Sequence, residues 1–107
     1  MYARRVSLHL KPNSTAAFAE RLEQQVIPML QKQSGFRDEI TFVTPGGTEA
    51  FGLSLWDNKQ SAENYNQKSY AEVTKILEKV LDGAPRLETY EVANSTFHKI
   101  AAPAATL

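Results

Sequence analysis

The sequence contains no cysteine, and its 12 Lys and Arg residues are balanced by 12 Asp and Glu residues. Without cysteine the chain can form no disulfide, no thiolate nucleophile and no cysteine-ligated metal site. A formal net charge of zero leaves no long-range field to attract nucleic acid or anionic lipid. We therefore expect neither a nucleic-acid partner nor a membrane partner.

Long apolar runs are also missing from the sequence. The stretch Tyr2 to Leu10 alternates apolar and polar residues, unlike a signal peptide, and nothing approaches the ~18 apolar residues of a membrane span. The pattern favours a cytoplasmic protein. A chain of 107 residues fits one domain, which we place at residues 1–98, with residues 99–107 as a C-terminal tail.

Strand and helix patterns alternate along the chain. Period-two alternation predicts strands, and apolar residues at helical spacing predict helices. The predicted strands are Tyr2 to Leu10, Arg37 to Val43, Phe51 to Trp56 and Leu87 to Phe97. The predicted helices run from Ser14 or Thr15 to about Gln33, and from Asp57 to about Leu81.

Particular residues predict where these helices begin, bend and end. Pro28 lacks an N–H donor, so we expect a kink or a new turn there. Gly35 is expected to end the first helix in a left-handed conformation. Asp57 is expected to cap the second helix, with Gln60 in the capping-box position, and the polar stretch Asn64 to Ser69 predicts a bend or break.

The order βαββαβ predicts an α+β, ferredoxin-like fold, in which an antiparallel sheet carries two helices on one face. The opposite face suits a partner sheet, so we expect a homodimer through it, with Arg5, His9 and Glu91 paired there. From the alternation we place these residues on that face: Arg5, Ser7, His9, Thr41, Val43, Ser54, Trp56, Thr89 and Glu91.

The pair Gly35-Phe36, the following hairpin, and Trp56 followed by Ala62 and Tyr65 resemble the antibiotic biosynthesis monooxygenase-like family of the dimeric α+β barrel superfamily. The likeness covers about residues 2–97. It implies a homodimer with two sheets face to face and a ligand between each sheet and its own helices. The family includes cofactor-independent oxygenases of aromatic polyketides, quinol monooxygenases and haem-degrading enzymes.

The haem-degrading branch of that family uses an Asn on the first strand, and a Trp and an iron-binding His on the second helix. The matching positions here hold Val6, Tyr65 and Lys75. Lys is a poor iron ligand at neutral pH. The resemblance therefore does not extend to haem degradation.

An aromatic set forms the candidate ligand site. Trp56, Tyr65, Tyr70 and Tyr90 can line a site for a small aromatic or quinone-like compound, and Asn64 and Asn66 can orient a carbonyl group of the ligand. Tyr65 and Tyr70 are the catalytic candidates. The alternative is that the aromatic residues belong to the core and that Asn64 lies on the helix surface.

The two histidines of the chain are not included in the candidate site. We interpret His9 as a partner of Glu91 or of a second chain, and His98 as solvated. No recognisable ligand spacing indicates a metal, and no cofactor is expected.

Three functions remain open. The first is a cofactor-independent monooxygenase of a small aromatic or quinol-like compound. The second is a non-oxidative ligand-binding or isomerase-type protein on the same fold. The third is a dimeric interaction module without catalysis. A cavity between sheet and helices would favour the first two, and a filled interior would favour the third.

Overall fold

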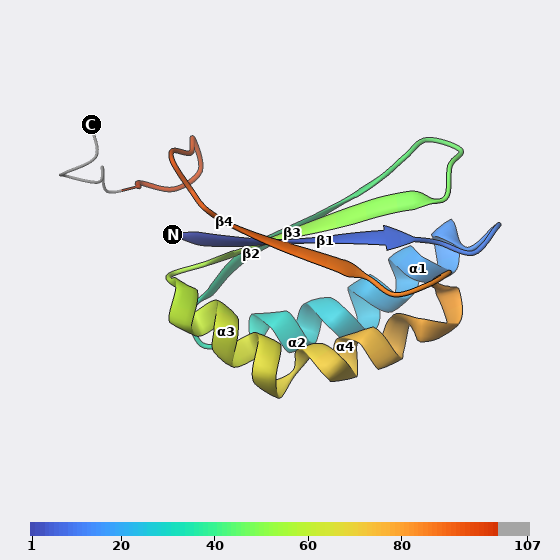
Figure 1. Cartoon of the computed structure of the whole chain (residues 1–107), viewed down its shortest axis with the longest axis horizontal. Coiled ribbons are helices and arrows are strands. Elements are labelled where there is room, and N and C mark those ends of the chain that lie inside the picture. The colour runs from blue at the N-terminus through green and yellow to red at the C-terminus, as the bar shows by residue number, and fades with distance from the viewer. Residues whose placement is uncertain (101–107) are drawn as a thin grey trace.

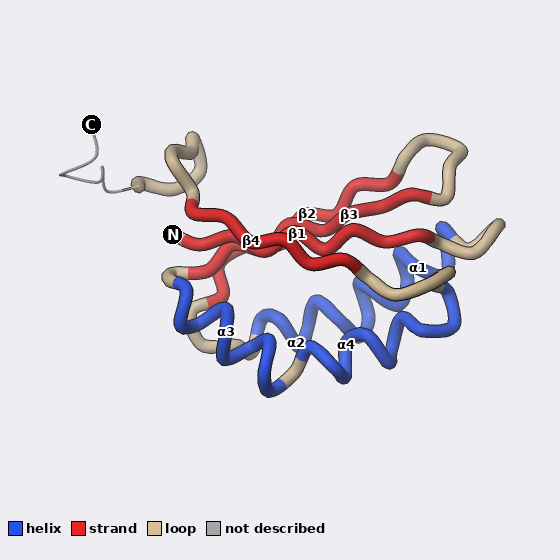
Figure 2. The backbone as a smooth tube through the Cα atoms, in the orientation of Figure 1, coloured by secondary structure: helices blue, strands red, loops and turns tan. Residues whose placement is uncertain are grey.

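The computed structural model describes residues 1–100, which form one antiparallel sheet with all helices on one face (Figure 1, Figure 2). The strands are β1 (Tyr2–His9), β2 (Phe36–Val43), β3 (Glu49–Trp56) and β4 (Arg86–Glu91), in the spatial order β2-β3-β1-β4. The helices are α1 (Thr15–Arg21), α2 (Ile27–Gln31), α3 (Lys59–Lys68) and α4 (Tyr70–Leu77), with a π-helical turn η1 (Leu22–Val26) and a 3₁₀ turn η2 (Glu78–Val80). This is the predicted ferredoxin-like βαββαβ fold.

The first helical region is interrupted before Pro28, as the sequence predicts. The π-helical turn η1 separates α1 from α2, and Pro28 lies in the first turn of α2. Pro has no N–H to give to the carbonyl four residues back, so the chain widens locally and starts a new helical segment. Ser14 precedes α1 but makes no side-chain capping bond.

The second helical region begins one residue later than predicted and breaks where expected. Asn58, not Asp57, is the N-cap, and its side chain accepts a hydrogen bond of 2.9 Å from the Ser61 N–H. Asp57 instead pairs with Arg37, while its own N–H donates to the Gly35 carbonyl over 2.8 Å. Ser69 separates α3 from α4.

Gly35 takes the predicted left-handed conformation, with φ of +81°. A Cβ at this position would overlap the side chain of Ser61 in the first turn of α3. The chain can therefore turn tightly from the first helical region into β2 beneath α3 only with glycine here.

The structure corrects the predicted faces of the hairpin. Pairing of Ser54 with Arg4, and of Trp56 with Tyr2, puts the even-numbered residues of β3 on the helix side. The same register puts Thr41 and Val43 of β2 on the helix side. The open face instead carries apolar residues of these strands, namely Ile40, Phe42, Phe51, Leu53 and Leu55.

The prediction for the charged groups of the open face is partly wrong. Arg5, Ser7 and His9 lie there as predicted, but Thr89 and Glu91 pair with Arg4 and Tyr2 and so share the helix side of the sheet. The carboxylate near His9 is that of Glu49, at 4.0 Å, rather than that of Glu91. The open face is therefore less polar than the sequence suggested.

Strand β4 ends at Glu91, well before the predicted end at Phe97. Residues 92–100 have no regular structure, and His98, predicted to be solvated, contacts Asp38 of β2, at the opposite edge of the sheet from β4. Most of the predicted tail, residues 101–107, lies outside the described residues. None of the helices within residues 1–100 is long and apolar enough to cross a membrane.

Candidate functional site

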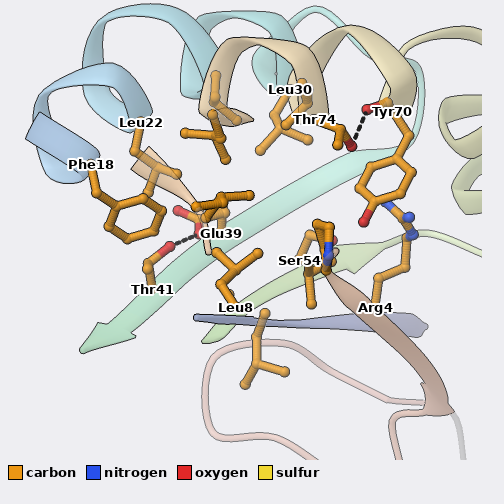
Figure 3. A pocket seen from close by; sticks show the side chains of 18 of the residues that line it. Arg4, Leu8, Phe18, Leu22, Leu30, Glu39, Thr41, Ser54, Tyr70 and Thr74 are labelled. Carbon is orange, nitrogen blue, oxygen red and sulfur yellow. Dashed lines mark hydrogen bonds between the residues drawn. The ribbon is translucent and has the colours of Figure 1, made fainter. Parts of the chain in front are cut away.

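A cavity of about 70 Å³ lies between the sheet and the helices (Figure 3). Its walls are mostly aliphatic and aromatic, and come from β1, β2, β3, η1 and both helical regions. The helical walls are formed by Phe18, Leu22, Val26, Leu30, Tyr65, Tyr70, Val73, Thr74 and Leu77. The polar groups come chiefly from the sheet, which forms the floor.

The floor is set by two rows of paired residues across three strands. Arg4 of β1 and Glu39 of β2 both pair with Ser54 of β3, so the three share one row. Strands in a sheet are ~4.8 Å apart, which puts the Cα atoms of Arg4 and Glu39 about 10 Å apart. In the next row Gly52 leaves space, and a Cβ there would lie 3.4 Å from both Glu39 Oε1 and Thr41 Oγ1.

Arg4 is only 2% exposed, and it lies against two aromatic rings. Its guanidinium carbon is 4.8 Å from the ring centre of Tyr65 and 4.6 Å from that of Tyr70, and Nη2 donates to Asn66 Oδ1 over 2.9 Å. Burial lowers the pKa of Arg4, although a guanidinium stays protonated at neutral pH. Arg4 is thus a buried cation at one end of the cavity.

Glu39 is a half-buried carboxylate at the other end, near Phe18 (Figure 3). The hydroxyl of Thr41 donates to Glu39 Oε1. Burial raises the pKa of Glu39 above its ordinary value of 4.5, and the Thr41 bond opposes this effect. The site therefore holds a carboxylate that is a stronger base than a solvated one.

Of the predicted site residues, Tyr65 and Tyr70 line the cavity. Their ring centres are 6.3 Å apart. Burial raises the pKa of Tyr65 to about 12, despite the opposing effect of Arg4. At neutral pH the Tyr65 hydroxyl is therefore protonated and suited to donate a hydrogen bond, not to take a proton.

The other predicted site residues lie elsewhere. Trp56 is fully buried behind Tyr65, with its ring centre 5.0 Å away, and does not line the cavity. Asn64 is exposed and accepts a bond from Gln60. Tyr90 pairs with Ala3, so it points from the opposite face of the sheet and is 45% exposed. The prediction that Tyr90 shares a site with Tyr65 is wrong.

The sequence did not predict Arg4 and Glu39 as site residues, and Asn66, considered with Asn64 as a group that orients a ligand, instead accepts a hydrogen bond from Arg4. Arg4 and Glu39 meet only through the register of three strands, which local patterns do not contain. One available signal was Gly52, since a glycine inside a strand often marks a close approach of other groups. Another was the alternation of Glu39 and Thr41 with the apolar residues Ile40 and Phe42, which puts two polar side chains on one face of the strand.

Both irregularities of the helical regions border the cavity. The π-helical turn contributes Leu22 and Val26, and the break at Ser69 immediately precedes Tyr70. Such turns occur often at functional sites because they aim side chains that a regular helix would place elsewhere. Each helical region thus contributes side chains to the cavity from, or next to, its irregular turn.

Replacing Glu39 with Gln is expected to stabilise the protein at neutral pH. The folded state binds the carboxylate proton more tightly than the unfolded chain does. The contribution of Glu39 to the free energy of unfolding therefore falls as pH rises from 4.5 through the raised pKa. A neutral amide avoids that loss, worth less than about 1 kcal/mol for a partly screened group. Thermal unfolding should show a higher midpoint for Glu39→Gln at pH 7 and a smaller difference near pH 4.

The matched control for this experiment is Glu72→Gln, on the exposed surface of α4. Its midpoint should follow the parent at both pH values. A Glu39→Gln protein that is less stable than the parent at pH 7 would show that the carboxylate has a stabilising partner.

Comparison with known structures supports the fold independently of the sequence patterns. No protein-family model matches the chain, and no curated protein matches its sequence. A protein of Bordetella bronchiseptica, assigned to antibiotic biosynthesis monooxygenases, superposes with a TM-score of 0.72 at 12% identity, over 85% of this chain and 95% of the other. The chain has the fold of the antibiotic biosynthesis monooxygenases.

Two oxygenases with this fold are also similar in structure. A monooxygenase of Streptomyces coelicolor, from the gene ActVA-Orf6, was solved with the ligand Nanaomycin D. It has a TM-score of 0.76 at 16% identity, over 92% of each chain. SnoaB of Streptomyces nogalater, a cofactor-independent oxygenase, has a TM-score of 0.73 at 7% identity, over 89% of this chain and 95% of the other. At these identities the likeness extends to the fold alone.

Proposed function

We propose that this protein is a cofactor-independent monooxygenase of a small aromatic or quinol-like compound, bound between the sheet and the helices. The observation that carries the proposal is the apolar cavity into which Arg4, Glu39, Tyr65 and Tyr70 converge. An apolar cavity with a few convergent polar groups and shifted pKa values is typical of a small-molecule site. The fold shared with a cofactor-independent oxygenase adds support.

The proposed reaction needs no bound metal or flavin because the substrate supplies the electrons. An electron-rich aromatic anion reduces O₂ and combines with it, giving a peroxide on a ring carbon. For an anthrone the CH₂ group and O₂ then become a C=O group and water, so one oxygen atom enters the product. The protein's part is to bind the ring, remove a proton and stabilise the anion.

Within this proposal the two tyrosines do different work. Tyr65, with its pKa of about 12, serves as a hydrogen-bond donor to a substrate oxygen. Tyr70 is half-buried at the same end of the cavity and packs against Arg4. Arg4 also supplies a positive charge to the developing anion, which favours electron transfer to O₂.

A non-oxidative ligand-binding protein is the second candidate, and the size of the cavity favours it. An engineered cavity of about 150 Å³ holds benzene, whereas this one has about 70 Å³. An aromatic ring fits only if Tyr70 or the adjoining helix break moves outward. A ligand smaller than a ring would need no such motion.

A homodimer through the open face of the sheet is also part of the proposal. Ile40 is 50% exposed and Phe42 is 42% exposed on that face. Arg5 Nε and Ser7 Oγ are buried there without a hydrogen-bond partner within residues 1–100. A second sheet would cover the apolar groups and supply partners for the polar ones.

Oxygen uptake by metal-stripped protein tests the proposed activity. The protein is incubated with a panel of hydroquinones and anthrones under oxygen, and quinone absorbance is followed in parallel. Tyr65→Phe and Tyr70→Phe should each lower kcat/KM by about fivefold, which corresponds to one hydrogen bond of ~1 kcal/mol.

Tyr2→Phe is the matched control, since Tyr2 does not line the cavity. It should retain the parent rate. If no compound is oxidised above background, or if both cavity variants match the parent, the oxygenase proposal is wrong and the ligand-binding function takes its place.

A further inference from the structure

Two side chains of opposite charge lie unpaired on the floor of one cavity. Arg4 and Glu39 occupy the same cross-strand row, on either side of Ser54. No ion pair within residues 1–100 includes either of them. Figure 3 shows Arg4 beneath Tyr70 and Glu39 near Phe18, at opposite ends of the cavity.

Each charge has binding capacity that the protein leaves unused. A guanidinium has five N–H donors; Arg4 gives one to Asn66 and another to the Tyr65 hydroxyl oxygen, which leaves three. The Glu39 carboxylate accepts from Thr41 through Oε1 alone, although two oxygens can accept several bonds. Buried charges are normally paired or fully hydrogen-bonded, so both groups are placed to bind something else.

We propose that this cavity, once Tyr70 or the adjoining helix break has moved outward, binds an aromatic compound with an anionic oxygen at one end and a hydroxyl group at the other. Arg4 binds the anionic oxygen, and the Glu39 carboxylate takes the hydroxyl proton. The O–H bond of the ligand breaks, the proton bonds to a Glu39 oxygen, and the electron pair stays on the ligand as a phenolate. This inference rests on the cavity being a ligand site, as in the proposed function.

The surroundings of Glu39 suit this role. The helices above the floor present apolar side chains to it, among them Phe18, Leu22 and Leu30. The other ionisable groups in the cavity are Arg4, Tyr65 and Tyr70, all at its opposite end. The carboxylate therefore meets a ligand hydroxyl in an apolar setting, where a charged hydrogen bond is strong.

Three matched probes test the two ends of the cavity separately. The first is 4-hydroxybenzoate, the second is benzoate, which lacks the hydroxyl group, and the third is phenol, which lacks the carboxylate. Binding is measured by the fluorescence of Trp56, the single tryptophan, whose ring centre is 5.0 Å from that of Tyr65. The proteins are the parent, Glu39→Gln and the surface control Glu72→Gln. Oxygen uptake with the hydroquinone and anthrone panel is measured on the same preparations.

We expect the parent to bind 4-hydroxybenzoate at least about tenfold more tightly than benzoate or phenol, as charged hydrogen bonds at both ends require. The Glu39→Gln protein should bind 4-hydroxybenzoate no more tightly than benzoate, but still more tightly than phenol. The Glu72→Gln protein should show both differences in affinity, like the parent. Comparing probes in one protein tests the Arg4 end without a substitution that could unfold the chain.

Equal affinity of the parent for the three probes, or no binding of any, would overturn the inference. So would an equal loss for all probes in Glu39→Gln, which would indicate a structural role. If the probes bind as expected and no compound of the panel is oxidised, the ligand assignment stands and the oxygenase proposal fails. If oxidation occurs and the three affinities are equal, the oxygenase proposal stands and this ligand assignment fails.

Discussion

Replacing Trp56 with Ala is expected to lower the free energy of unfolding by about 3–5 kcal/mol. Trp56 has no exposed surface and lies where β3 meets the loop before α3. Its ring contacts Phe36 edge-on at 5.5 Å and stacks on Tyr65 at 5.0 Å, while Nε1 donates to Ser54 Oγ over 2.9 Å. Truncation would remove all three contacts and leave a hole between sheet and helix.

Thermal or urea unfolding measures this loss. For a domain of this size, 3 kcal/mol corresponds to a fall in melting temperature of more than about 10 °C. Trp56→Phe is the graded control, because it keeps most of the ring contact and loses only the N–H donor. An alanine variant that melts within a degree or two of the parent would contradict the anchoring role.

The second large effect is expected for Ile40→Asp on the open face of β2. Because Ile40 is half-exposed in the single chain, the change should leave the subunit folded. In the proposed dimer the new carboxylate would be buried without a partner, at a cost of several kcal/mol. The dissociation constant should rise more than about a hundredfold, and the protein should sediment as a monomer of 11.9 kDa.

Ala71→Asp on the exposed surface of α4 is the control for added charge, and it should sediment like the parent. The parent itself should sediment at twice the monomer mass at micromolar concentration. If the parent is a stable monomer at that concentration, the proposed dimer is wrong, and the proposals for the cavity are unaffected.

The element order was predictable from sequence because each signal is local. Alternation marked the strands, Pro28 marked the end of the regular helix, and Gly35 supplied the left-handed turn that φ of +81° requires. The predicted break between Asn64 and Ser69 is confirmed by the gap between α3 and α4. The N-cap was misplaced by one residue because Asp57 and Asn58 are both good caps.

The faces of the hairpin and the site were not predictable in the same way. In an ordinary two-layer domain the apolar face of a strand packs on the helices. On that basis the two faces of the hairpin were predicted the wrong way round. Here the middle of β2 and β3 turns Ile40, Phe42, Phe51 and Leu53 to the open face, while Glu39, Thr41, Gly52 and Ser54 face the helices. The reversal makes physical sense because the polar side forms the floor of a cavity.

Labelling with ¹⁸O₂ can show whether this cavity holds the compound that O₂ oxidises, by comparing the parent with a variant whose cavity is filled by a side chain. Gly52→Val would place a side chain against Glu39 and Thr41 on the floor. With an anthrone as substrate, we expect the metal-stripped parent to place one ¹⁸O atom in the new C=O group of the quinone product, and folded Gly52→Val protein to place none. Unlabelled product from the parent, or equal labelling by both proteins, would contradict it.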